Sequence, residues 1–124
     1  YALIVDTNIQ FTCTTICELL LPFNTDDDIV ATFPFAVDNL GEYYDTYALK
    51  TLDYKKQLSL CTGSFIPVLS AFGGLGLVKQ RHYNNVYYGT PANECDNEHV
   101  FCNTMLSKYG TLLVCKAAHC IWYS

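Results

Sequence analysis

Cysteine and histidine residues are concentrated in the last third of this chain, where their side chains could hold a metal ion or form disulfides. They occur in two runs, Cys95-x3-His99-x2-Cys102 and Cys115-x3-His119-Cys120. Thiolates and imidazoles at these spacings can surround a tetrahedral Zn²⁺, which needs four ligands. The chain has no C-x2-C pair of the kind zinc sites commonly use, so the spacing favours disulfides among the four cysteines. We therefore expect no metal ion and no other cofactor.

The whole chain carries seven cysteines in 124 residues, an odd number. If the thiols pair, one is left free or joined to another molecule. Disulfides are typical of small domains in oxidising compartments, so this content predicts a secreted, extracellular protein. The disulfide candidates are Cys13, Cys17, Cys61, Cys95, Cys102, Cys115 and Cys120.

A short segment near the C-terminus resembles the histidine segment of chymotrypsin-like serine proteases. The matching residues are Ala117-Ala118-His119-Cys120, with Phe101-Cys102 upstream. In that family a cysteine bridge clamps the loop that carries the general base, which implies a bridge between Cys102 and Cys120. Lys116 stands where the family has Ser or Thr, and 124 residues are too few for its two barrels. We keep the bridge as a prediction and do not expect protease activity.

A second resemblance concerns the pattern Cys95-Asp96-x5-Cys102, which follows Arg81-His82. Together they resemble a fragment of secreted phospholipase A2, where an aspartate orients a histidine that activates water. The resemblance implies His82 as the base and Asp96 as its partner. Because Tyr83 replaces a calcium ligand, the implied protein is a degenerate, inactive member of that family. This alternative predicts long helices over residues 40–58 and 91–109.

The segments that must position these residues alternate between apolar and polar side chains, which is typical of extended strands. Residues 9–21 and 28–38 both show this period of two. Pro34 in the second segment predicts an edge strand, because proline cannot donate a hydrogen bond to a neighbouring strand.

Two hairpins are also predicted. Asn84-Asn85 is a plausible turn between strands 77–83 and 86–89. Strands 100–106 and 111–123 flank a second turn, in which Gly110 suits a left-handed closing position. On the last strand, alternation predicts one shared face for Leu113, Cys115, Ala117, His119 and Ile121.

Helical readings compete with these strands. One helical stripe would contain Ile9, Cys13, Ile16, Cys17 and Leu20, and Thr90-Pro91 is typical of a helix start. Threonine, tyrosine, valine and isoleucine are nevertheless plentiful, whereas the lysine and glutamate of helix surfaces are scarce. We therefore expect a mostly β, disulfide-stapled β-sandwich or jelly-roll-like single domain over residues 1–124, with one or two short helices. The alternative is an α+β fold with disulfide-bridged helices.

Charge excludes two classes of partner. Only 15% of the residues are charged, and the formal net charge is −5. The seven basic residues are scattered, so the chain lacks the concentrated positive surface that nucleic acids or anionic membranes require. The longest apolar tract, residues 65–78, is short of the roughly 20 residues of a transmembrane helix and is broken by proline and glycine.

Low charge and ten tyrosines instead favour contact with protein, since tyrosine is enriched in interfaces. We expect a non-enzymatic extracellular structural module that acts through protein–protein contact, with another copy of itself as the partner. Oligomers or filaments would form by strand exchange, as in β-augmentation. The expected assembly strand is Tyr1, Ala2, Leu3, Ile4 and Val5.

Overall fold

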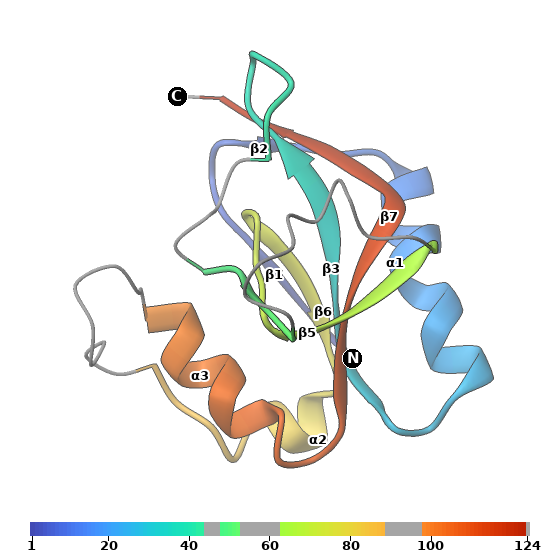
Figure 1. The fold of residues 1–124 in the computed structure, drawn as a ribbon, viewed down its shortest axis with the longest axis vertical. Helices are drawn as coiled ribbons and strands as arrows, with labels where there is room; N and C mark the ends of the chain where they lie inside the picture. The colour runs from blue at the N-terminus through green and yellow to red at the C-terminus, as the bar shows by residue number, and fades with distance from the viewer. Residues whose placement is uncertain (44–47, 53–62, 89–97, 124) are drawn as a thin grey trace.

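A computed structural model describes residues 1–43, 48–52, 63–88 and 98–123 of the chain. The protein is mostly β: its strands form one mixed sheet of seven strands, accompanied by short helices (Figure 1). The predicted mostly β class is therefore confirmed. The predicted sandwich or jelly roll is not what the described residues form, because all their strands belong to a single sheet with helices on its two faces.

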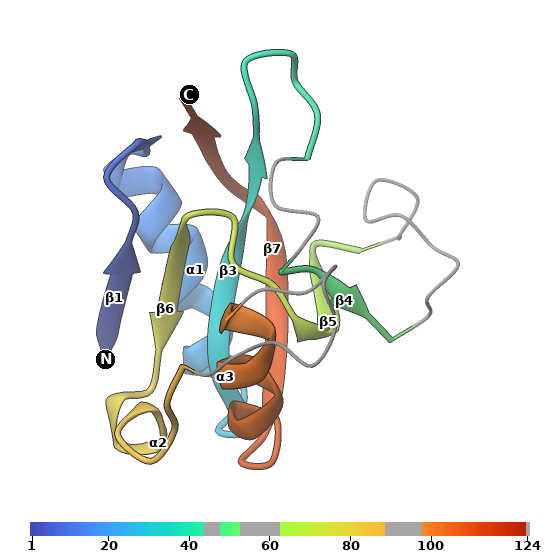
Figure 2. The ribbon, with the colours of Figure 1, turned by 90° about the vertical axis from the view of Figure 1, so that its left-hand side faces the viewer.

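The sheet runs in the order β1-β6-β3-β7-β5-β4 (Figure 2). The short strand β2 pairs with β7. Its central strands, β3 and β7, are parallel, and the other pairs are antiparallel. The strands are β1 (Ala2–Val5), β2 (Ile9–Gln10), β3 (Ile29–Val37), β4 (Lys50–Thr51), β5 (Phe65–Ser70), β6 (Leu75–Val78) and β7 (Thr111–Trp122). The first strand of the chain thus lies at one edge of the sheet.

The predicted strand over residues 9–21 is wrong beyond its first residues, because helix α1 (Cys13–Thr25) begins there. A capping box starts the helix: the Thr12 and Thr15 side chains each bond the backbone of the other residue. Thr15, Leu19 and Phe23 are buried at a spacing of four, the period of a helix rather than a strand. The competing helical reading was the correct one for this segment.

The predicted strand over residues 28–38 is confirmed as β3, but its position is not at an edge. It lies between β6 and β7, and Ile29 to Ala36 are buried on both faces except for half-buried Phe35. Pro34 is tolerated because β6 pairs only with Ala31 and Thr32, and because the register with β7 shifts directly after Pro34. Its missing N–H therefore leaves no gap in the pairing with β6.

Neither predicted hairpin forms. Residues 80–83 make the short helix α2 (Gln80–Tyr83), and Asn84 ends it by donating its N–H to the Gln80 carbonyl. Residues 98–106 make helix α3 (Glu98–Leu106) instead of a strand. The chain then passes directly from α3 into β7, and the φ of Gly110 is not positive.

The strand predicted over 111–123 is confirmed as β7, although its faces change along its length. Leu113 and Cys115 are buried, whereas Ala117, His119 and Ile121 are exposed. The cause is the register shift against β3, where Pro34 pairs with Cys115 but the next residue, Phe35, pairs with His119. The extra residues of β7 reverse which positions face α1.

The helices cover opposite faces of the sheet (Figures 1 and 2). On one face, Leu19 and Phe23 of α1 pack in a cluster with Leu75, Leu77 and Leu113. On the other, Cys102 and Leu106 of α3 belong to a second cluster. Two hydrogen bonds from buried side chains fix these layers: Thr32 Oγ1 donates to the Leu19 carbonyl (2.8 Å), and Asn103 Nδ2 donates to the Ala71 carbonyl (2.7 Å).

Candidate functional site: an open sheet edge and two exposed thiols

The outer side of β1 is the open edge of the sheet, since none of the described strands pairs with it. Its inner side pairs with β6, with Ile4 opposite Gly76 and Val5 opposite Leu75. The Asp6 N–H continues this register by donating to the Gly74 carbonyl (2.8 Å). Hydrogen-bonded and non-hydrogen-bonded pairs alternate along an antiparallel ladder. Ala2, Ile4 and Asp6 therefore direct their backbone groups toward β6, and Leu3 and Val5 direct theirs outward.

The side chains of β1 also alternate. Ala2 and Ile4 pack against the core cluster on the α3 face, whereas the odd residues lie on the α1 face. There the Tyr1 ring contacts the Phe23 ring at 5.0 Å between centroids, yet Tyr1 stays 63% exposed. Leu3 and Val5 lie on the same face and remain 41% and 43% exposed. One short segment therefore combines outward backbone groups with exposed apolar side chains.

This edge lacks the features with which proteins usually protect edge strands. Charged residues, proline and bulges discourage pairing with other chains. The side chains of residues 1–5 include no charged group and no proline, and β1 pairs with β6 without a register shift. The strand at the opposite end of the sheet, β4, has only two residues. The edge at β1 is thus the better template for an added strand.

The cysteines divide into two groups, and the five described ones are free thiols. Cys13 and Cys17 are exposed on α1, whereas Cys102, Cys115 and Cys120 are buried. The predicted bridge between Cys102 and Cys120 is therefore not present, nor is any other disulfide among the described residues. The physical reason is topological: Cys102 lies on α3, which covers one face of the sheet, and not on a strand next to β7. Cys61 and Cys95 lie outside the described residues.

Burial makes the three inner thiols chemically inert. It raises the pKa of Cys102 to about 11 and the pKa of Cys120 to about 12. For Cys115, burial first and the Glu18 carboxylate second raise the pKa to about 12. Because the thiolate is the reactive form, these residues are poor nucleophiles and poor metal ligands at neutral pH.

The six-residue cysteine and histidine cluster is not assembled among the described residues, where no three potential ligands gather. His99 stacks on Phe72 with ring centroids 3.9 Å apart, on the α3 face. His119 is exposed on β7, while Cys120 points into the interior. Cys95 belongs to the part of the chain that is not described.

His82, the base implied by the phospholipase resemblance, lies on α2. Its ring stacks on Tyr109 with centroids 4.7 Å apart, and its Nε2 accepts a hydrogen bond from Arg81 Nε (3.3 Å). Desolvation, and then the positive charges of Arg81 and Lys79, lower the pKa of His82. Its predicted partner Asp96 lies outside the described residues. This resemblance predicts two long helices. Within the first range, residues 40–58, residues 50–51 form strand β4 instead. Within the second, residues 91–109, the described helix is α3, Glu98–Leu106.

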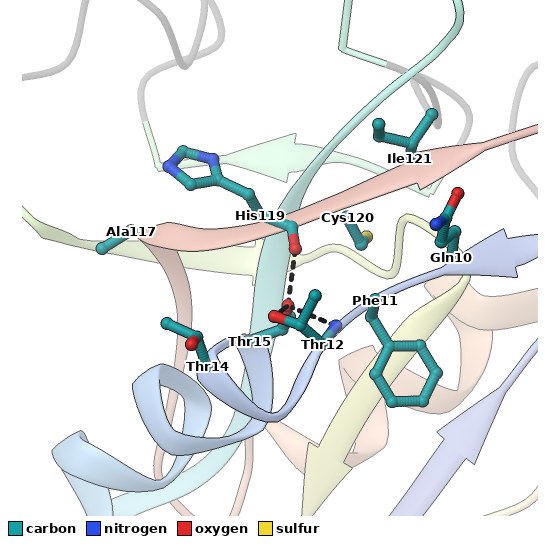
Figure 3. Close-up of a pocket in the computed structure, with 9 residues that line it drawn as sticks. All are labelled: Gln10, Phe11, Thr12, Thr14, Thr15, Ala117, His119, Cys120 and Ile121. Carbon is teal, nitrogen blue, oxygen red and sulfur yellow. Dashed lines mark hydrogen bonds between the residues drawn. The ribbon is translucent and has the colours of Figure 1, made fainter.

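A cavity of about 270 Å³ opens between the start of α1 and the last part of β7 (Figure 3). The Thr15 hydroxyl donates to the His119 carbonyl (2.7 Å) at its wall, and the His119 imidazole points away from that bond. Among the described residues, no carboxylate lines the cavity or partners His119 there. The lining residues are Gln10, Phe11, Thr12, Thr14, Thr15, Ala117, His119, Cys120 and Ile121.

Several of the described tyrosines lie on the surface. Tyr87, Tyr88, Tyr109 and Tyr123 are each at least 42% exposed. The Tyr88 hydroxyl bonds the Tyr83 hydroxyl at 2.5 Å, and burial followed by this bond raises the pKa of Tyr88. Exposed tyrosines are what the sequence predicts for a protein that contacts other proteins.

Comparisons with known proteins identify no relative: no family model, no curated protein and no solved structure matches the chain. None of the described helices is long and apolar enough to cross a membrane.

The sequence predicted residues 1–5 as the assembly strand but did not show which of these residues face away from the sheet. Only the pairing with β6 defines which of them face outward. Sequence reasoning also missed the pair Cys13 and Cys17 as a surface feature. The four-residue spacing was a usable signal, because it places two side chains on one face of a helix.

Proposed function

We propose that this chain is a non-enzymatic, extracellular structural module that acts through protein–protein contact, with a second copy of itself as the partner. The contact is the outer edge of β1. The observation that carries the proposal is the coincidence, at Leu3 and Val5, of outward backbone groups and exposed apolar side chains on an uncharged edge strand.

The edge is complementary to itself. If two copies pair antiparallel with Leu3 opposite Leu3, Val5 of each copy lies opposite Tyr1 of the other. These are the residues whose backbone groups point outward, so each facing pair can exchange N–H and C=O bonds. The same register brings the exposed Leu3, Val5 and Tyr1 side chains of both copies onto one face. Asp6 falls beyond the paired segment, so the contact brings no carboxylates together.

The position of β1 favours pairing of the β1 edges of two copies, with each β1 kept in its own sheet, over transfer of β1 from one copy into the sheet of the other. Ala2 and Ile4 pack against the core, and Tyr1 contacts Phe23. Removing β1 would also uncover β6, all of whose residues are buried. A strand pair this short makes a small interface, and small interfaces are typical of weak association.

The extracellular location is supported by the cysteine content alone. In an oxidising compartment the exposed Cys13 and Cys17 would not remain thiols. Non-reducing peptide mapping of the protein isolated from its source tests this: oxidised Cys13 and Cys17 support the location, and reduced thiols at both contradict it.

The assembly proposal is tested by Leu3→Lys under reducing conditions. In a two-fold contact this change places two ammonium groups opposite each other and weakens the pairing. We expect sedimentation equilibrium to show reversible dimerisation of the wild type and a loss of about tenfold or more in affinity for Leu3→Lys, which corresponds to about 1.4 kcal/mol.

Leu40→Lys is the matched control, because Leu40 is 82% exposed and lies in a loop away from β1. It should dimerise like the wild type, and both variants should keep the thermal midpoint within a few degrees. A wild type that stays monomeric at about 1 mM, or a Leu3→Lys variant that associates equally well, contradicts the proposal.

A further inference from the structure

The exposed thiols of α1 have no route to an intramolecular bond with each other. Cys13 and Cys17 are four residues apart on a continuous helix. Side chains at this spacing have Cβ atoms about 5–6 Å apart, whereas a disulfide requires about 3.5–4.5 Å. The two thiols share a face of the helix but cannot bridge without unwinding it.

The other described thiols cannot form a disulfide with Cys13 or Cys17 either, because they are buried in the core. Cys102, Cys115 and Cys120 are at most 2% exposed, and burial raises the pKa of each. Among the described residues, the available partner for an α1 thiol is therefore a thiol on another molecule.

The surface around Cys17 allows another molecule to approach closely. On a helix, the neighbours of residue 17 are residues 13, 14, 20 and 21. Here these are Cys13, Thr14, Leu20 and Leu21, none of them charged, and Leu21 is 48% exposed. Glu18 is the single charged residue of α1, so two copies of this face would meet without a cluster of like charges. The surface is formed by Cys13, Cys17 and Leu21, and we call it the α1 thiol face.

We propose that Cys17 is an oxidation site that links two copies of this chain across the α1 thiol face. In a two-fold contact centred on Cys17, this thiol faces its own equivalent, and Cys13 faces Leu21 of the other copy when the helices are antiparallel. A small disulfide such as oxidised glutathione is the oxidant. The Cys17 thiolate of one copy attacks it and releases one glutathione thiol. The Cys17 thiolate of the second copy then displaces the other, so that one S–S bond is lost and one is gained.

The consequence is filament growth, and this part of the inference rests on the proposed function at β1. A single two-fold contact closes into a dimer, whereas two different two-fold contacts on one chain extend the assembly beyond a dimer, and they produce an open chain of subunits when their axes do not intersect. The β1 edge and the α1 thiol face are separate surfaces, because α1 packs over β3 and β7 while β1 ends the sheet (Figure 2).

The test compares four full-length chains after equilibration with oxidised glutathione: wild type, Cys17→Ser, Leu3→Lys and the double variant. Sedimentation equilibrium at about 1 mM protein measures mass without diluting the weak β1 contact, and peptide mapping without reduction identifies the bridges. We expect polymers for the wild type, non-covalent dimers for Cys17→Ser, covalent dimers for Leu3→Lys and monomers for the double variant. The matched control, Cys13→Ser, should polymerise like the wild type.

The two surfaces can fail separately in this experiment. Covalent species that persist in Cys17→Ser, or a wild-type Cys17 found only with bound glutathione, overturn the inference and leave the β1 proposal standing. Covalent dimers in both the wild type and Leu3→Lys, with no larger species in either, support the Cys17 link and contradict the β1 contact. Reduction with dithiothreitol should return wild-type polymers to the mass of the Cys17→Ser protein.

Discussion

At the scale of single residues, the buried amide of Asn103 shows how polar groups fix the arrangement of this fold. Asn103 is 5% exposed, and its Nδ2 donates to Ser70 Oγ (3.0 Å) and to the Ala71 carbonyl (2.7 Å). Both acceptors belong to fully buried residues, at the end of β5. The amide therefore joins α3 to the sheet at a place where water cannot replace it.

We expect Asn103→Ala to lower the free energy of unfolding by about 2–3 kcal/mol, because two buried acceptors lose their donor. Thr104→Ala on the same helix is the control, since Thr104 is exposed and should change stability by about 0.5 kcal/mol or less. Urea unfolding of the three proteins measures the difference. Equal midpoints for the two variants would show that the Asn103 bonds do not stabilise the fold.

At the scale of elements, the sequence predicted the long strands of the sheet correctly. It failed at the segment that forms helix α1, where a strand was predicted. The β1, β3 and β7 segments are strands as predicted, but a period of two in burial holds along β1 alone of these three, because β3 is buried on both faces and β7 changes face along its length. Helix α1 was ambiguous because Cys13, Cys17 and Leu21 satisfy the spacing of both a strand and a helix. What decided between them is the Thr12–Thr15 capping box and the burial of Leu19 and Phe23, which depend on the sheet below.

Gly110, in the turn before β7, was predicted for a reason that the structure does not support. Gly110 is required for close approach rather than for a left-handed φ, because a Cβ there would fall on the Asp28 carbonyl oxygen. That oxygen accepts the Thr111 N–H (2.8 Å), which sets the start of β7 beside β3. Such a contact joins residues far apart in the chain, so no local pattern in the sequence could reveal it.

We expect Gly110→Ala to cost about 3 kcal/mol of stability, because the added methyl group must displace backbone atoms between β3 and β7. Gly41→Ala is the control: its φ of 83° is unfavourable for alanine, but no atom of a described residue beyond its chain neighbours lies within 4 Å of the added Cβ. That change should cost about 1 kcal/mol. Thermal unfolding of both variants tests the order, and a Gly110→Ala protein as stable as Gly41→Ala would contradict the close-approach account.

At the scale of the whole molecule, the helices shield the two faces of the sheet from solvent but leave the two proposed contact surfaces exposed. Helices cover both faces of the sheet, yet the β1 edge and the α1 thiol face remain exposed and uncharged. The sequence indicated the assembly strand and the importance of cysteine. It could not indicate that the described cysteines stay unpaired, because their positions relative to one another depend on the packing of α1 and α3 on opposite faces. The sequence could therefore predict that residues 1–5 form the candidate site. It could not predict which of these residues direct their backbone groups and side chains outward.

The central claim, that β1 accepts the edge of a second copy, predicts a specific alternation of amide protection. Hydrogen exchange of the reduced wild-type protein should be measured by NMR from about 10 μM to about 1 mM, a range that covers weak association. The amides of Ile4 and Asp6 face β6 and should be protected at every concentration. The amides of Leu3 and Val5 face outward and should exchange rapidly in dilute solution and slow down as the protein is concentrated. Rapid exchange of Leu3 and Val5 across the whole range, with Ile4 and Asp6 protected, would contradict the account.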